Sequence, residues 1–338
     1  MKAIVLTTIN VPKNIPEFME KADGEWIPII VGDLKTPHPA VEKICKQNHG
    51  IYLSPEKQMT LGFSHAAAVS WNCYDRKNIG YLFALREGAE IIYSTDDDNF
   101  PTVDHWDSFI KLGKQKIETV SSGSGWWNCC SLGDAAITPR GYPVWLIKET
   151  PEYKFTQKQT DIGVQVGLWV GDPDIDAMTR ILINPTVKKY MEKDVALDSG
   201  TMCPYNSQNT FIAREMMPAN MLWSCPRTEY YRYDDIFAGY VGQVIAWHHG
   251  KRIKFGHPLL RQDRNAHDLA KDLRSEIGGM ECQKDFFSIL RSIELKSTRA
   301  CENLRQIVYA ELATIPTLPV SLKAQVDTWC ADLEKMGL

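Results

Sequence analysis

Three absences limit what this sequence can encode. The 338 residues contain no run of about 18 apolar residues, the length needed to span a bilayer. The first ten residues, MKAIVLTTIN, hold a single lysine and too short an apolar stretch for a signal peptide. Basic residues are not in excess, because the formal net charge is -4, so global charge points to neither nucleic acid nor anionic lipid. We therefore expect a cytoplasmic protein without a membrane-spanning segment.

Cysteine is present, but not with the spacing of a zinc or dithiol site. The nine cysteines are an odd number, and no two of them are separated by two residues. We expect reduced, mostly buried thiols. The sequence has no internal repeat and no low-complexity tract. Its length allows one large domain or two smaller ones.

The first 117 residues alternate between two hydrophobic periods. Apolar runs at 2–8, 26–33 and 90–96 are typical of buried strands, whereas 14–22, 39–48 and 75–90 have helical spacing. In the third helix we expect Asp75 as the N-cap and Gly88 as the stop. Such alternation predicts an α/β fold with a mostly parallel central sheet.

The rest of the chain has a different texture. Short runs broken by Gly, Pro, Asn and Ser fill 118–210 and indicate a loop-rich site region. Residues 234–248 predict a helix that leads into a strand, KRIKFG. After Glu281 the pattern is helical to the end, with PTLP at 316–319 as the only break.

Three consecutive carboxylates, Asp96, Asp97 and Asp98, follow the third strand. Ligands of open α/β sheets bind beyond the carboxyl ends of the strands. Like charges about 4 Å apart repel by about 4 kcal/mol at an effective dielectric near 20, so a half-buried triplet needs a cation. A Mn²⁺ or Mg²⁺ ion would supply one and keep places for phosphate groups. The alternative is a solvated turn that caps a helix at 103–113.

Polar residues from neighbouring strands are expected at the same edge. Some end or follow the first two strands, and others open the helix before the Asp run, where an anion meets a helix N-terminus and fixed cations. A solvated helix start would have the same sequence. These candidates are Thr7, Thr8, Asp33, Lys35, Arg76, Lys77 and Asn78.

Several long motifs resemble known families. RKNIGYLFALREGAEIIYSTDDDN at 76–99 resembles the nucleotide-sugar site of the STELLO-type glycosyltransferase-like family. TDIGVQVGLWVGDPDIDAMTR (160–180), MCPYNSQNTFIAREM (202–216) and RYDDIFAGYVGQVI (232–245) resemble plant reversibly glycosylated polypeptides, the UDP-arabinopyranose mutases. Together these motifs cover about residues 1–275 in consistent order.

The resemblance implies a GT-A, Rossmann-like fold with a helical C-terminal tail. Asp96 and Asp98 would bind Mn²⁺ or Mg²⁺ and through it the diphosphate of a UDP-sugar, with Asp97 between them. Asp33 would bind the base, and Arg76 would face the diphosphate. The resemblance also implies one domain at 1–280, with a nucleotide-binding half (1–117) and a sugar and acceptor half (118–280), before a helical extension at 281–338.

Further site residues follow from the resemblance or from position. Arg140, in RGYP, matches the arginine that becomes reversibly glycosylated in the mutases, although their second arginine is Ile147 here. Asp234 and Asp235 are candidates for acceptor activation, with a helix N-cap as the alternative. His257 and His267 are candidates for a third metal ligand, whereas the histidine of the plant pattern falls at Gln262. Candidates for the sugar pocket, each with a turn or core position as the alternative, are Asp198, Asn206, Asn209, Trp126, Trp127 and Trp169.

Three functions stay open at this point. The first is a metal-dependent transferase that moves a sugar, for example arabinose, from a UDP-sugar to a nucleotide sugar, a glycan or a modified DNA base. The second is a mutase with Arg140 as the transient acceptor. The third is a non-catalytic scaffold, with the C-terminal helices as an element for homo-oligomer formation. Fold alone does not choose among them.

Overall fold

A mixed 10-stranded sheet forms the centre of the molecule in this computed structural model, which describes residues 1–225, 231–264, 268–312 and 321–338. The strand order is β3-β2-β1-β4-β9-β7-β6-β8-β10-β5. The strands are β1 (Lys2–Thr8), β2 (Ile27–Gly32), β3 (Ile51–Leu53), β4 (Ile91–Thr95), β5 (Asn99–Pro101), β6 (Gly113–Ser122), β7 (Tyr153–Val170), β8 (Val195–Leu197), β9 (Asn209–Ala213) and β10 (Lys251–Gln262).

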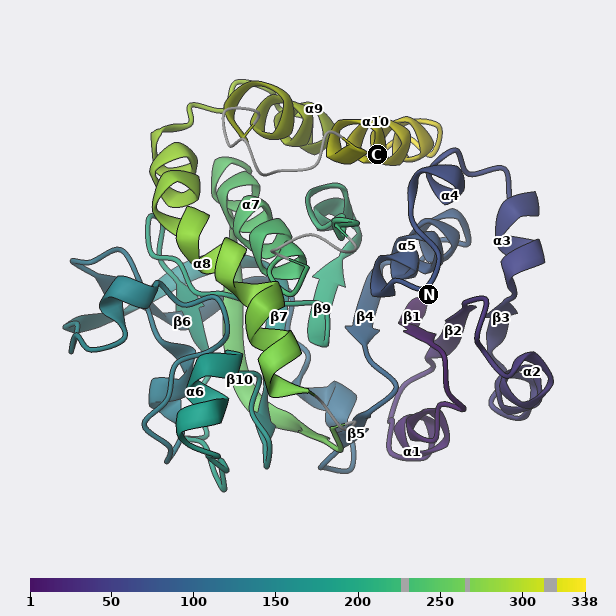
Figure 1. The fold of residues 1–338 in the computed structure, drawn as a ribbon, viewed down its shortest axis with the longest axis horizontal. Coiled ribbons are helices and arrows are strands. Elements are labelled where there is room, and N and C mark those ends of the chain that lie inside the picture. Colours follow the sequence, from purple (N-terminus) through teal and green to yellow (C-terminus); the bar gives the residue numbers. More distant parts are fainter. Residues whose placement is uncertain (226–230, 265–267, 313–320) are drawn as a thin grey trace.

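Helices pack against this sheet, and α7 and α8 lie side by side in front of β7 and β10 (Figure 1). Their contact includes stacked rings of Phe237 and Phe286, with centroids 4.2 Å apart. The α-helices of the described residues are α1 (Asn14–Glu20), α2 (His38–Gln47), α3 (Pro55–Thr60), α4 (His65–Ala68), α5 (Lys77–Arg86), α6 (Ala177–Leu182), α7 (Asp234–His248), α8 (Leu269–Ser292), α9 (Ala300–Gln306) and α10 (Ser321–Glu334).

The α/β class and the elements expected in the first hundred residues are confirmed. β1, β2 and β4 match the three apolar runs, and α5 ends before Gly88, whose φ of 85° suits a residue without a Cβ. Two details are wrong. Asp75 lies in a 3-10 turn (Tyr74–Arg76) and does not cap α5, and the helix expected at 103–113 is only a 3-10 turn at Trp106–Phe109.

The sheet is purely parallel in its N-terminal half, whereas the other half mixes both directions, with β10 parallel to β7 and β8 parallel to β6. β3, β2, β1 and β4 are parallel neighbours, as the alternating pattern predicts. β9 then runs antiparallel to both β4 and β7. The 18-residue β7 crosses the region expected to be rich in loops, because its first half is solvent-exposed and polar and carries no apolar run. The architecture is therefore mixed rather than mostly parallel.

The C-terminal helices pack onto the chain's own core. In α10, Val326, Trp329 and Leu333 are fully buried, and the Trp329 indole N–H donates to the carbonyl of Pro218 at 3.2 Å. α10 lies near α4 (Figure 1), and the Asp332 carboxylate accepts the His65 backbone N–H at 2.8 Å. Helical structure begins at Leu269, before the expected 281, and PTLP (316–319) lies outside the described residues. Assembly through this tail stays a prediction.

The sequence predicts the absence of a membrane-spanning segment and the presence of reduced, mostly buried cysteines. None of the described helices has the length and hydropathy of a membrane span. The cysteines are free thiols, and all except the half-buried Cys282 are buried.

Candidate functional site

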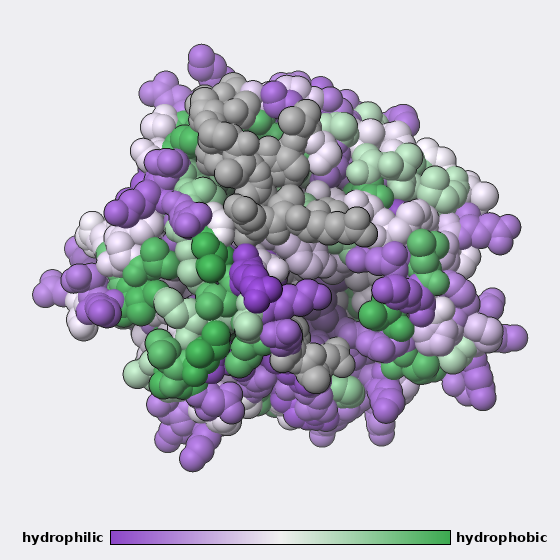
Figure 2. All heavy atoms as spheres, viewed as in Figure 1, coloured by the Kyte–Doolittle hydropathy of each residue, from purple (hydrophilic) through white to green (hydrophobic). Residues whose placement is uncertain are grey.

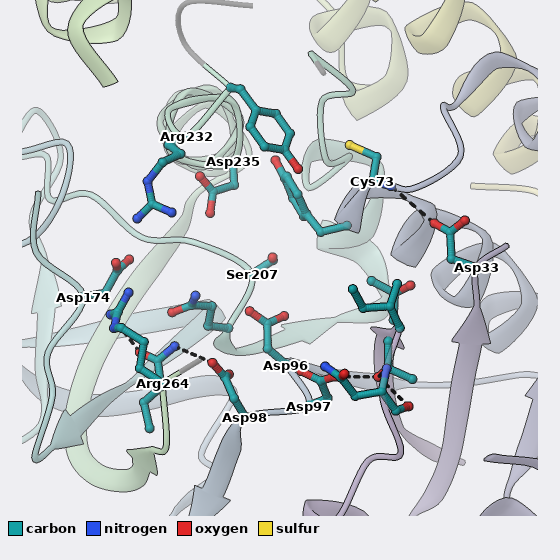
Figure 3. A pocket seen from close by; sticks show the side chains of 18 of the residues that line it. Asp33, Cys73, Asp96, Asp97, Asp98, Asp174, Ser207, Arg232, Asp235 and Arg264 are labelled. Atoms are coloured by element: carbon teal, nitrogen blue, oxygen red, sulfur yellow. Dashed lines mark hydrogen bonds between the residues drawn. The ribbon is translucent and has the colours of Figure 1, made fainter. Parts of the chain in front are cut away.

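A cavity of about 370 Å³ lies at the carboxyl ends of β1, β2 and β4. The face seen in Figure 2 is hollowed near its centre, where hydrophilic side chains gather. In Figure 3, Asp33 is at one side of the cavity, the Asp run is below its centre, and Arg232, Asp174 and Arg264 are at the opposite side. Thr7, Thr8, Asp33 and the three aspartates of the run line the cavity, as the sequence predicts.

The Asp run is held in place from three elements. Asn14, at the start of α1, donates its side-chain amide to the carbonyls of Asp96 and Asn99, at 2.8 Å each. The ammonium of Lys77, fully buried in α5, is 2.6 Å from Asp96 Oδ1. One cation of the protein itself therefore compensates part of the triplet's charge.

The other two carboxylates are less well compensated. Asp97 accepts hydrogen bonds from the Thr8 hydroxyl at 2.5 Å and from the Asn10 amide at 3.2 Å, and burial raises its pKa. Asp98 Oδ2 accepts from the Gln262 side-chain amide at 3.0 Å, whereas its buried Oδ1 has no partner among the described residues. Burial, and next the charge of Asp96, raise the pKa of Asp98 to about 6.

These groups fit a divalent cation. An unpartnered buried carboxylate oxygen costs free energy that a cation would recover, and oxygen atoms are the ligands that Mg²⁺ and Mn²⁺ prefer. The described residues contain no group of three or more His, Cys, Asp or Glu side chains placed to hold a metal by themselves. A cation at Asp96 and Asp98 therefore needs further ligands from water or from a bound molecule.

Arg140 lies at the opposite side of the cavity, in a network of buried ion pairs. Its Nε and Nη2 donate to Asp174, and its Nη1 and Nη2 donate to Asp235, at 3.1–3.3 Å. Its Nη1 also contacts the Arg232 carbonyl. Burial alone would raise the pKa of Asp174, but the charge of Arg140 lowers it to about 2. Every guanidinium nitrogen is thus engaged by an acceptor.

Asp234 and Asp235 begin α7 and have different environments. The Tyr74 hydroxyl donates to Asp234 Oδ1 at 2.6 Å, while Asp234 Oδ2 is buried without a partner among the described residues. Burial, and next the charge of Asp235, raise the pKa of Asp234 well above its ordinary value. Asp235 accepts hydrogen bonds from Arg140 Nη1 and Nη2, at 3.1 and 3.2 Å. The two neighbouring acids therefore differ, because Asp235 is paired with a guanidinium and Asp234 with a phenol.

Four residues that were expected to contact the bound ligand do not line the cavity. Arg76 does not line the cavity: it is fully buried, donates to Gln58 and to the Ala66 and Val69 carbonyls, and stacks on Trp71 at 3.5 Å. The Asn78 amide bonds to His65 and Leu222, so it too is part of the core. Two more are not among the cavity-lining residues. They are the exposed Lys35 and the buried Lys77, which reaches the cavity only through Asp96.

Other candidates lie away from the cavity. Asp198 pairs with Lys158 at 2.5 Å, and His257 is 3.5 Å from Asp194, so neither reaches the Asp run. His267 lies outside the described residues. Core packing or buried hydrogen bonds hold the remaining candidates, and Asn206 reaches the site through Asp174, at 2.5 Å, and through Gln208, at 3.0 Å. Those that serve the core are Trp126, Trp127, Trp169 and Asn209.

Sequence reasoning did not single out Asp174 and Arg232 as site residues. It named Gln262 only as the place where the plant pattern has its histidine, and it counted Arg264 within a basic surplus that could bind the diphosphate, an anionic acceptor or nothing. Asp174 follows the end of β7 in the stretch GDPDID, so a run of aspartates at a strand end was the available signal. Gln262 ends β10, a strand that was expected to stop at KRIKFG, and Arg264 follows two residues later. The four residues can be recognised as one site only in the folded chain, where β7, β10 and α7 meet at the same edge of the sheet.

Three comparisons place the chain among known proteins. UDP-arabinopyranose mutase 3 of Arabidopsis thaliana is 26% identical over 286 residues, which cover 80% of this chain and 75% of that protein. The probable glycosyltransferase STELLO1 of the same plant is 25% identical over 272 residues, 74% of this chain but 34% of the relative, so the chain spans about a third of its length. A solved glucosyl-3-phosphoglycerate synthase from Mycobacterium tuberculosis, in complex with Mn²⁺ and UDP-glucose, is similar with a TM-score of 0.42 and 10% identity, covering 84% of this chain and 78% of that one.

The sequence model of a single family spans nearly the whole chain. It is the model of the reversibly glycosylated polypeptide, and it matches residues 28–333. Mutases and STELLO glycosyltransferases both occur among the relatives, in agreement with the two resemblances seen in the motifs. The chain belongs to the reversibly glycosylated polypeptide family.

Proposed function

We propose that the protein is a glycosyltransferase that binds a UDP-sugar together with Mn²⁺ or Mg²⁺ and transfers the sugar to a separate acceptor. The observation that carries the proposal is the charge of the cavity. Its described lining holds seven aspartates against three arginines, and each arginine is already paired with a carboxylate. A diphosphate would be repelled by such a cavity unless a cation entered with it. Nucleotide binding should therefore depend on metal.

In this proposal the nucleotide and the sugar of the UDP-sugar bind at opposite sides of the cavity. Asp33, held by the Leu34 and Cys73 backbone N–H groups at 2.6 and 3.3 Å, is placed to accept an N–H of the uracil ring. Asp96 and Asp98 would hold the cation, which stabilises negative charge on the leaving diphosphate. The sugar would then lie toward Arg140 and Asp174, where fixed donors and acceptors match its hydroxyl groups.

Asp235 is the proposed orienting base for the acceptor hydroxyl. Its side chain lines the cavity and is paired with the Arg140 guanidinium at 3.1 Å. The raised pKa of Asp234 favours its protonated form, so the two neighbouring acids are assigned separate roles in this proposal. The Tyr74 hydroxyl, at 2.6 Å, fixes the orientation of Asp234.

Calorimetry of UDP binding tests the metal-dependent step. We expect the wild type to bind UDP with Mn²⁺ or Mg²⁺ and to lose detectable binding in EDTA and in Asp98→Ala. Asp198→Ala is the matched control, because Asp198 is paired with Lys158 away from the cavity. Metal-independent binding, or Asp98→Ala binding as the wild type does, would refute the proposal. Mass spectrometry of products from a panel of UDP-sugars with glycan, nucleotide-sugar and hydroxymethylated DNA acceptors then identifies the acceptor.

A mutase with Arg140 as transient acceptor is the second candidate. It is favoured by the position of Arg140 in the lining of the cavity, at the residue that the resemblance assigns to glycosylation. The ion pairs count against it, because a glycosylated nitrogen would have to leave at least one acceptor of Asp174 or Asp235 unpaired in a buried place. Incubation with a radiolabelled UDP-sugar alone separates the two: label retained by denatured wild type but not by Arg140→Lys identifies the mutase, and no label supports the transferase.

A further inference from the structure

Among the described residues, the side chains beside the Asp run offer a cation oxygen atoms as ligands. No histidine of the described ranges lines the cavity. His257, the candidate third ligand that the structure describes, is turned toward Asp194, and its ring packs against Phe109 with 4.6 Å between centroids. Cys73 lies at the Asp33 side of the cavity, and burial raises the pKa of its thiol, so it stays protonated. Carboxylate, amide and hydroxyl groups are left near the Asp run.

Gln262 is the side chain that touches Asp98 directly. It is the last residue of β10 and is paired with Asn99 of β5, so the backbone holds it beside the Asp run. The Asp263 N–H donates to the Asp98 carbonyl at 2.8 Å and fixes the same register. Gln262 is only 8% exposed, and its side-chain amide donates from Nε2 to Asp98 Oδ2 at 3.0 Å.

Arg264 fixes which end of the Gln262 amide faces Asp98. Its Nη2 donates to Gln262 Oε1 at 3.0 Å, and its Nε donates to Asp172 at 2.8 Å. A guanidinium only donates hydrogen bonds, so the amide oxygen must face Arg264 and the amide nitrogen must face the carboxylate. An amide nitrogen has no lone pair to offer a metal. Gln262 therefore occupies Asp98 Oδ2 without being a ligand, and Oδ1 is the oxygen left free.

We infer that Gln262 is a positioning residue that holds Asp98 so that Oδ1 alone faces the cation, and that the cation is bound by oxygen atoms only. This inference rests on the proposed function and specifies its metal site. Residues behind metal ligands typically change metal affinity by about 10–100-fold when they are removed. An oxygen-only site also suits hard cations, so Mg²⁺ and Mn²⁺ should bind within about tenfold of each other, whereas an imidazole ligand favours the transition metal.

Three variants test the two parts of the inference. Gln262→Met keeps the length of the side chain and removes the donor to Asp98. Gln262→His places an imidazole nitrogen beside the same carboxylate. Gln159→His adds a histidine at an exposed position of β7 and controls for nonspecific metal capture. Thermal unfolding of each variant verifies that it is folded.

Metal binding is measured in the presence of UDP by calorimetry and by electron spin-echo spectroscopy of bound Mn²⁺. We expect the wild-type spectrum to lack modulation from a directly bound imidazole nitrogen, and Gln262→His, but not Gln159→His, to gain it. Gln262→Met should bind Mn²⁺ and Mg²⁺ about 10–100-fold more weakly. The spectrum needs only the wild type, so it decides the ligand type even if a variant misfolds.

Two results would overturn the inference while leaving the proposed function in place. Imidazole modulation in the wild type would show a nitrogen ligand, and unchanged metal affinity in folded Gln262→Met would show that Gln262 does not position Asp98. Absence of any metal-dependent UDP binding by the wild type is a different outcome, because it would overturn the proposed function and this inference together.

Discussion

Replacement of Arg140 by methionine is the sharpest test of the buried ion pairs. The side chain is 5% exposed and balances two carboxylates, Asp174 and Asp235, that are themselves nearly inaccessible to water. Methionine is similar in length and apolar, so the variant removes the charge and the donors without opening a large cavity. Both carboxylates would then be buried without a cation.

The magnitude follows from the pKa of Asp174. Arg140 lowers it from 3.8 to about 2 against the opposing effect of burial, which corresponds to about 2.4 kcal/mol of stability from this carboxylate alone. Asp235 adds a second uncompensated charge. Removing one partner of a buried pair generally costs about 3–5 kcal/mol, and we expect a loss of that size in the free energy of unfolding at pH 7.

Urea unfolding followed by circular dichroism measures this loss. Because Asp174 has a depressed pKa, its contribution in the wild type is complete above about pH 4 and is lost as the pH falls toward 2, and Arg140→Met should not show this loss. Arg299→Met is the control: Arg299 is 52% exposed, and its pair with Glu302 should contribute less than about 1 kcal/mol. A loss below about 1 kcal/mol in Arg140→Met would refute the reasoning and favour a loosely held, reactive Arg140.

Two further predictions concern the core. Burial lowers the pKa of His65 to about 4 from 6.5, so its contribution to stability is complete above pH 6.5 and falls by up to about 3 kcal/mol as the pH approaches 4. Unfolding at pH 7 and at pH 4.5 should show this fall in the wild type but not in His65→Gln. The control is His49→Gln, which alters an exposed histidine and should behave as the wild type does. In Gly80→Ala the new Cβ would lie 2.5 Å from Val5 and 2.7 Å from Val31, so we expect the free energy of unfolding to fall by about 1–3 kcal/mol. In the control Gly123→Ala, where the new Cβ has nothing within 4 Å, it should change by no more than about 0.5 kcal/mol. Equal effects in the two variants would contradict the packing described.

The cation side of the site was predictable because its residues follow strands with clear periodicity. Thr8, Asp33 and Asp96 each come at the end of a buried parallel strand, and parallel strands bring their carboxyl ends to one edge. Their convergence thus follows from local pattern alone. No such pattern marks Asp174, because β7 has a polar, exposed first half, and its antiparallel neighbours are far away in sequence.

For Arg76 the prediction fails in the opposite way, because the sequence predicts a site residue where the structure has a core residue. An arginine at the start of a helix that precedes a strand is expected to meet an anion, but Trp71, five positions earlier, offers a ring on which the guanidinium stacks at 3.5 Å. The backbone carbonyls of Ala66 and Val69 then complete its hydrogen bonds. Sequence gives the charge of a side chain but not the direction in which it points. That direction depended here on the short turns between 61 and 76.

The position of α10 has a consequence for how the chain is made. His65 and Asp332 are hydrogen-bonded across 267 residues, and the Trp329 ring covers the imidazole at 5.5 Å between centroids. During synthesis at about 5–20 residues per second, the first segment must wait roughly 15–50 s for this cover to be translated. The N-terminal half therefore leaves the ribosome with an incomplete core, and its last buried contacts form only once α10 has been made and has emerged.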